Sequence, residues 1–123
     1  MLRERSIVHI ADNSGAIKVM LFAVCGKNKN QYARVGSIVT GSVKQATPRG
    51  KIQKGQIVQV LIIRTKARIH RPDGSSISFS DNAGVIVNKQ TKEPIATRIF
   101  GPVAREVKDL GHNKIASLAE EVL

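Results

Sequence analysis

Residues 56–88 of this chain, QIVQVLIIRTKARIHRPDGSSISFSDNAGVIVN, decide its fold. Apolar and mostly β-branched residues fill both ends of this stretch, whereas its middle is polar and turns at Pro72-Asp73-Gly74. After the turn, Ile77 and Phe79 alternate with serines, which is the pattern of a half-buried strand. We therefore predict one long β-hairpin, with a root in the hydrophobic core and a tip that is too polar to be buried.

Cationic side chains fall on every second position just before the turn, at Arg64, Lys66 and Arg68, and His70 continues the series. Because successive side chains of a strand point to opposite faces, this spacing predicts one cationic side. For a lone basic strand, a merely solvated face is the simpler interpretation. The charge of the surrounding sequence decides between a solvated face and a binding surface.

The net charge of +11 is concentrated in one part of the chain. No acidic residue occurs between Asp12 and Asp73, yet this stretch holds twelve of the 20 Lys and Arg residues. The rest of the chain carries eight basic and nine acidic residues, so the middle supplies the whole excess. A surface of one sign repels itself unless an anionic partner neutralises it. This distribution favours a nucleic acid as the partner, with anionic lipid or an acidic protein as alternatives.

Shorter segments outside the hairpin also have the pattern of strands separated by turns. Residues 6–11, 16–25 and 35–43 are apolar or β-branched, and four turn residues, DNSG (12–15), separate the first two. Residues 46–50 form another turn before the hairpin. This succession of short strands is typical of a small β-barrel or β-sandwich.

The last third of the chain predicts two short helices. Pro102 suits the first turn of a helix, and Gly111 is suited to end it. Apolar residues recur at helical spacing in both predicted helices, at Val103, Val107 and Leu110 and then at Ile115, Leu118, Ala119 and Val122. We expect the two helices to cap an open end or an edge of the barrel.

The chain of 123 residues is predicted to form one domain, residues 1–123. No apolar run approaches the roughly 20 residues that a membrane helix needs, so we expect no membrane partner. The N-terminus lacks the apolar region of a secretory signal. A single cysteine, Cys25, excludes an intramolecular disulfide.

No group of residues indicates catalysis or a cofactor. The three histidines, His9, His70 and His112, are scattered and have no Cys or carboxylate at metal-ligand spacing. Cys25 ends an apolar segment, which favours a structural thiol over a nucleophile. The glycines form neither a phosphate-binding loop nor a dinucleotide-binding fingerprint. We therefore predict a protein that is not an enzyme and that uses no metal, cofactor or small-molecule substrate.

The few aromatic residues indicate how a nucleic acid would be bound. There are four, Phe22, Tyr32, Phe79 and Phe100, and all but Tyr32 lie in apolar sequence context. Proteins that bind single strands stack bases on exposed aromatic side chains, which this chain hardly offers. Most of its basic residues lie in strand and turn segments, so an Arg-rich helix for the major groove is also missing. We expect contacts between basic loops and the phosphates of a folded RNA.

Six segments are informative in combination: HIADNSGA (9–16), YARVG (32–36), VKQATPRGKIQKG (43–55), LIIRTKARIHRPDGSSISFSDNAGVIV (61–87), PIATRIFGPVAREV (94–107) and KIASLAEEVL (114–123). They cover most of the chain, and the hairpin together with TRIFGPV is the most specific part. With these segments the chain resembles the large-subunit ribosomal protein family called L-fourteen, which occurs in ribosomes of all domains of life.

The resemblance implies a mainly β fold, a small five-stranded β-barrel with a projecting β-hairpin and two short C-terminal α-helices. It implies a structural constituent of the ribosome, of the bacterial or organellar type. Such a protein binds large-subunit (23S-type) ribosomal RNA through basic loops and a β-ribbon, and contributes to the intersubunit interface. The alternative left open by the residues is a free RNA-binding or regulatory module of the same fold.

The resemblance also implies partners and a location. The partners are small-subunit rRNA across the interface, the neighbouring ribosomal proteins L-three and L-nineteen and, in bacteria and organelles, a ribosome-silencing factor. The location is the ribosome, in the bacterial cytoplasm or in the matrix of a mitochondrion or plastid.

Nine basic residues in the matching segments are the predicted RNA contacts: Lys44, Arg49, Lys51, Lys54, Arg64, Lys66, Arg68, Arg71 and Arg98. For Arg98, and for Arg105, salt bridges to Glu93, Glu106 or Asp109 are an equally supported alternative.

Overall fold

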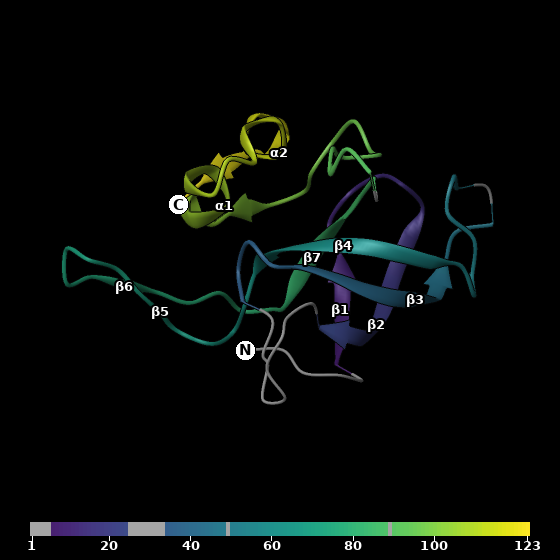
Figure 1. Cartoon of the computed structure of the whole chain (residues 1–123), viewed down its shortest axis with the longest axis horizontal. Helices are drawn as coiled ribbons and strands as arrows, with labels where there is room; N and C mark the ends of the chain where they lie inside the picture. The colour runs from purple at the N-terminus through teal and green to yellow at the C-terminus, as the bar shows by residue number, and fades with distance from the viewer. Residues whose placement is uncertain (1–5, 25–33, 49, 89) are drawn as a thin grey trace.

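A computed structural model describes residues 6–24, 34–48, 50–88 and 90–123, with the side chains of residues 22–24 left aside. Five strands form a closed barrel in the order β1-β2-β3-β4-β7, which confirms the predicted five-stranded barrel (Figure 1). Strands β1 and β7 pair in parallel and all other neighbours are antiparallel. The barrel strands are β1 (Ile7–Ile10), β2 (Ala16–Val24), β3 (Ile38–Ala46), β4 (Ile57–Arg64) and β7 (Ala83–Val87).

Strand β4 is buried on both faces because each face packs against a different part of the chain. Val58, Val60 and Ile62 belong to the hydrophobic cluster inside the barrel. Leu61 and Ile63, on the other face, belong to a second cluster that includes residues of the C-terminal segment. Alternate side chains of a strand point to opposite faces, so a continuous apolar run such as VLII is what two covered faces require.

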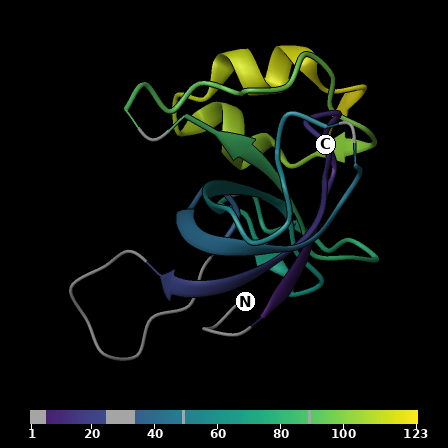
Figure 2. The same ribbon diagram turned by 90° about the vertical axis from the view of Figure 1, so that its right-hand side faces the viewer.

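The C-terminal segment lies over the outer face of β4 and β7 (Figures 1 and 2). It consists of β8 (Pro102–Val103), α1 (Arg105–Asp109), α2 (Asn113–Leu118) and β9 (Glu121–Val122). Val107 of α1 and Ile115 of α2 are fully buried against this face. The expectation that the helices cap an open end or an edge is therefore wrong, since they cover the side of a closed barrel.

The predicted helix boundaries also need correction. Pro102 is not in a helix: it pairs with Glu121 in the parallel β8–β9 ladder, and Ala104 is still extended, with φ −67° and ψ 142°. Gly111, with φ +96°, does follow the end of α1, as predicted. Leu110 lies just beyond the helix and is 61% exposed.

Residues 65–82 connect β4 to β7, and we call this segment the ribbon. It contains two strands of two residues each, β5 (Ile69–His70) and β6 (Ser76–Ile77), and extends away from the barrel (Figure 1). The predicted continuous cationic strand is interrupted, because β4 ends at Arg64 and residues 65–68 are not in a strand. Ile69 and Phe79 pack against the outer cluster, so the root of the ribbon is held by apolar contacts.

Candidate nucleic-acid interface

The nine predicted RNA contacts separate into three groups in the structure. Arg49 lies outside the described residues. Arg64 and Arg71 are turned toward the protein. Six residues have exposed side chains, which phosphates can reach: Lys44, Lys51, Lys54, Lys66, Arg68 and Arg98.

Four of these exposed cations lie near one another at one end of the barrel. Lys51 donates its backbone N–H to the Ser14 carbonyl at 3.0 Å, which places it against the turn of residues 12–15. The N–H of Gly55 donates to the Val43 carbonyl at 2.8 Å, which brings Lys54 beside Lys44. We call residues 12–15, 44–48, 50–56 and 94–99 the loop end. The loop between β3 and β4 lies at the right in Figure 1, and Figure 2 views the molecule from that side.

The DNSG turn joins the segments of the loop end. Asn13 accepts the backbone N–H groups of Thr97 and Arg98 at 3.1 and 3.2 Å through its side-chain oxygen. Asn13 N–H in turn donates to the Arg98 carbonyl at 3.3 Å. These bonds fix the backbone of Arg98 next to the turn that also contacts Lys51. The residues DNSG predict a tight turn, but a turn signal alone does not show which distant segment the turn binds.

Asp12 holds the same turn from inside the barrel end. Its carboxylate accepts the Ser14 hydroxyl at 2.6 Å, the Ser14 N–H at 3.1 Å and the Ile86 N–H at 2.9 Å. Burial raises the pKa of Asp12 above its ordinary value of 3.8, while the hydrogen bonds from Ser14 and Ile86 act in the opposite direction. This carboxylate therefore has a structural role in the turn.

The other two exposed cations, Lys66 and Arg68, lie on the ribbon, across the barrel from the β3–β4 loop (Figure 1). The N–H of Lys66 donates to the Asn82 side-chain oxygen at 2.9 Å, so its backbone is fixed between the two sides of the ribbon. The exposed basic residues thus form two areas, the loop end and the ribbon.

Arg64, one of the nine predicted RNA contacts, is bound by the protein in the structure. Its Nη1 donates to the carbonyls of Phe100 and Pro102, both at 3.1 Å, and its Nε lies 3.2 Å from Asp81 Oδ1. The residue is buried, because the C-terminal segment covers this face of β4. Arg64 therefore connects the root of the ribbon to residues 100–102 and does not present its charge to solvent.

Arg71 also binds the protein. Its Nε donates to Glu106 Oε1 at 2.7 Å, and its Nη2 donates to Glu106 Oε2 at 3.4 Å and to the Leu123 carbonyl at 2.7 Å. Partial burial acts to raise the pKa of Glu106, but the hydrogen bond from Arg71, a backbone hydrogen bond and the charges of Arg71 and Arg105 together outweigh it, so this pKa lies below 4.5. Residues 71 and 106 are 35 positions apart, so no local sequence signal predicts the pair.

The alternative of salt bridges for Arg98 and Arg105 is not what the structure shows. Glu93 lies 3.6 Å from Lys114 instead, and Glu106 is bound by Arg71. Neither Arg98 nor Arg105 has an ion-pair partner within the part of the chain that the structure describes. Both side chains are exposed and remain able to bind a phosphate or a protein neighbour.

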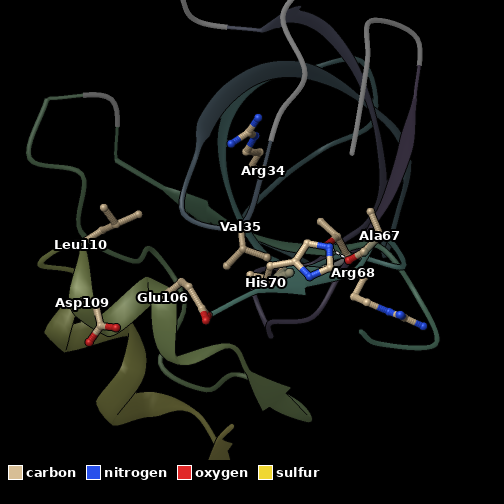
Figure 3. A pocket seen from close by; sticks show the side chains of 10 residues that line it. Arg34, Val35, Ala67, Arg68, His70, Glu106, Asp109 and Leu110 are labelled. Atoms are coloured by element: carbon tan, nitrogen blue, oxygen red, sulfur yellow. Dashed lines mark hydrogen bonds between the residues drawn. The ribbon is translucent and has the colours of Figure 1, made fainter. Parts of the chain in front are cut away.

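A groove of about 500 Å³ lies between the ribbon and α1 (Figure 3). Arg68 and His70 line it on the ribbon side, and Glu106, Asp109 and Leu110 line it on the other. In Figure 3 the guanidinium of Arg68 points away from α1, so it is directed to solvent and not to the carboxylates.

Residues 6–24, 34–48, 50–88 and 90–123 contain no group of three or more His, Cys, Asp or Glu side chains placed to hold a metal ion. In the same residues no helix is both long and apolar enough to span a bilayer.

The exposed cations, the barrel and the ribbon are accompanied by a family match along the whole chain. Residues 1–123 match the family described as Ribosomal protein L14p/L23e. The chain belongs to this family, and it is therefore a non-enzymatic structural constituent of the ribosome that binds ribosomal RNA.

Proposed function

We propose that the protein binds large-subunit ribosomal RNA through phosphate contacts from two separate basic areas. One is the loop end, with Lys44, Lys51, Lys54 and Arg98, and the other is the ribbon, with Lys66 and Arg68. The observation that carries this proposal is that these six exposed side chains have no carboxylate partner within the described residues. Free cations on loops and on a projecting ribbon suit the irregular backbone of a folded RNA.

Aromatic side chains support recognition of the RNA backbone and not of its bases. Phe79 is only partly accessible and packs against the outer cluster. Phe100 is 45% exposed, so it offers one stacking surface among the described residues. Tyr32 lies outside the described residues, as do Lys27 and Lys29. One exposed aromatic ring against six exposed cations favours binding dominated by phosphate contacts.

The proposed place is the intersubunit side of the large subunit, which family membership supports. There the protein would help to bridge to small-subunit rRNA and would pack beside the ribosomal proteins L-three and L-nineteen. The same exposed side would accept a ribosome-silencing factor in a bacterial cytoplasm or an organelle matrix.

Sedimentation of cell extracts tests this proposal. The wild-type protein is expected to sediment with large subunits and to stay bound through a moderate salt wash. A Lys66→Ser/Arg68→Ser variant should be released at lower salt, because it has lost two phosphate contacts. Arg64 is left intact, since its loss would disturb the barrel.

The matched control is Lys92→Ser/Lys108→Ser, which removes the same charge from exposed positions outside both basic areas. It should be washed off at the same salt concentration as the wild type. Wild-type protein found only in the soluble fraction would contradict the proposal and would favour a free RNA-binding module.

A further inference from the structure

We infer that Glu106 of α1 is a positioning residue for RNA binding, which fixes the direction of the ribbon through Arg71. The inference rests on the proposed function, in which Lys66 and Arg68 of the ribbon contact phosphates. Glu106 itself touches no RNA in this account. Helix α1 would thereby take part in RNA binding although it carries as many acidic as basic residues.

The ribbon is too weakly paired to hold a direction by itself. Its two strands share only the pairs Ile69–Ile77 and His70–Ser76. An isolated two-stranded hairpin is marginally stable in water. Apolar contacts hold its root, through Ile69 and Phe79, but the turn beyond them is polar and exposed.

Arg71 is the residue that connects the outer part of the ribbon to the C-terminal segment. Its backbone closes the turn, since its N–H donates to the Ser75 carbonyl at 2.9 Å and its carbonyl accepts the Gly74 N–H at 3.0 Å. Its guanidinium holds both carboxylate oxygens of Glu106 and the Leu123 carbonyl. One residue therefore joins the turn to two points of the C-terminal segment, with a planar group that fixes direction as well as distance.

The space between the ribbon and α1 shows why this connection matters. The groove of about 500 Å³ separates the segment Ala67–His70 from Asp109 and Leu110 (Figure 3). Apolar packing is thus interrupted between the root contacts and the Arg71–Glu106 pair. The side chains of the pair are only 19% and 25% exposed, so water screens it less than a pair on an open surface.

Two roles of Arg71 lead to opposite predictions for Glu106→Gln. If Arg71 were itself a phosphate contact, removing the neighbouring negative charge would release its guanidinium and strengthen RNA binding. If Glu106 positions the ribbon, the same substitution weakens binding, because the bound conformation must then be selected from a more mobile ribbon. The sign of the change separates the two roles.

The experiment measures binding of the full chain to deproteinised large-subunit ribosomal RNA at several salt concentrations. We expect Glu106→Gln to bind about threefold to tenfold more weakly than wild type, with an unchanged slope of log K against log salt. ¹⁵N relaxation of the amides of residues 73–76 should show larger motion in this variant. Asp109→Asn is the matched control, because it removes the same charge from the same helix and the same groove.

Asp109→Asn is expected to bind at least as tightly as wild type. Binding by Glu106→Gln that equals or exceeds that of Asp109→Asn would overturn the inference, and so would a reduced salt slope in Glu106→Gln. Circular dichroism shows whether each variant is folded, and only folded variants are compared. Lys66→Ser/Arg68→Ser in the same assay tests the ribbon contacts separately, since unchanged affinity there would refute the proposed function itself.

Discussion

Arg64 and Lys66 are two positions apart, yet one is buried and the other is exposed. Their spacing predicts a shared face, and this would hold if the strand continued through both. In the structure β4 ends at Arg64, and the segment of residues 100–102 supplies two carbonyls that accept hydrogen bonds from its Nη1. Spacing along a strand shows which side chains share a face, but only the packed chain shows what covers that face.

A substitution at Gly101 tests how much the contacts of the buried Arg64 contribute to stability. A Cβ at Gly101 would lie 2.3 Å from Arg64 Nη1, and the backbone there has φ +78°. The guanidinium could move aside only by giving up its bonds to Phe100 and Pro102. Gly101→Ala should therefore lower the free energy of unfolding by about 1 kcal/mol from backbone strain, plus about 1–3 kcal/mol from the lost buried bonds.

Gly74→Ala is the control for this substitution, measured by urea unfolding of both variants. Gly74 has a similar φ of +91°, but a Cβ there meets nothing within 4 Å. Gly74→Ala should therefore lose only the stability that the backbone strain costs. Equal losses of stability in the two variants would mean that the contacts of Arg64 contribute nothing measurable.

At the scale of elements, the sequence predicted the strands well and the C-terminal helices less well. The apolar runs of β2, β4 and β7 are long enough to be recognised as strands from the sequence. Each of these three strands lies where it was expected. Pro102 fits both the first turn of a helix and an edge strand. In the structure Pro102 is in a strand because it pairs with Glu121. The two residues are 19 positions apart, so the sequence around Pro102 does not predict this pairing.

The pairing of the ribbon with α1 predicts a dependence of stability on pH. The pKa of Glu106 in the folded protein lies below its ordinary value of 4.5. Because a lowered carboxylate pKa stabilises the folded state only when the group is ionised, this contribution is complete above pH 4.5 and is lost as the pH falls through the folded pKa. The stability difference between wild type and Glu106→Gln should therefore be constant near neutral pH and should shrink below pH 4.5.

Chemical unfolding of both proteins across this pH range measures that difference. Other carboxylates titrate in both proteins alike, so they cancel in the comparison. A difference that stays constant down to pH 3 would contradict the assignment of the ion pair to Glu106.

For the whole molecule, the sequence shows which segment carries the positive charge, but it does not show that the folded chain separates this charge into two areas. Its acid-free stretch extends from the loop end, through β4, into the ribbon. The eight residues of β4 span about 26 Å at the rise of an extended strand. This exceeds the roughly 8 Å screening length at physiological salt, so the two basic areas act almost independently on the RNA. A run of charge in sequence becomes two surfaces because a buried strand separates its halves.

The salt dependence of RNA binding shows whether the two phosphate-binding areas act independently on the RNA. Binding to large-subunit ribosomal RNA is measured for wild type, Lys44→Ser/Lys51→Ser/Lys54→Ser, Lys66→Ser/Arg68→Ser and the combined variant. At about 0.7–0.9 per lost phosphate contact, the slope of log K against log salt should fall by about 2.1–2.7 in the first variant and about 1.4–1.8 in the second. We predict that these reductions add in the combined variant, and a combined variant that keeps the wild-type slope would contradict the account.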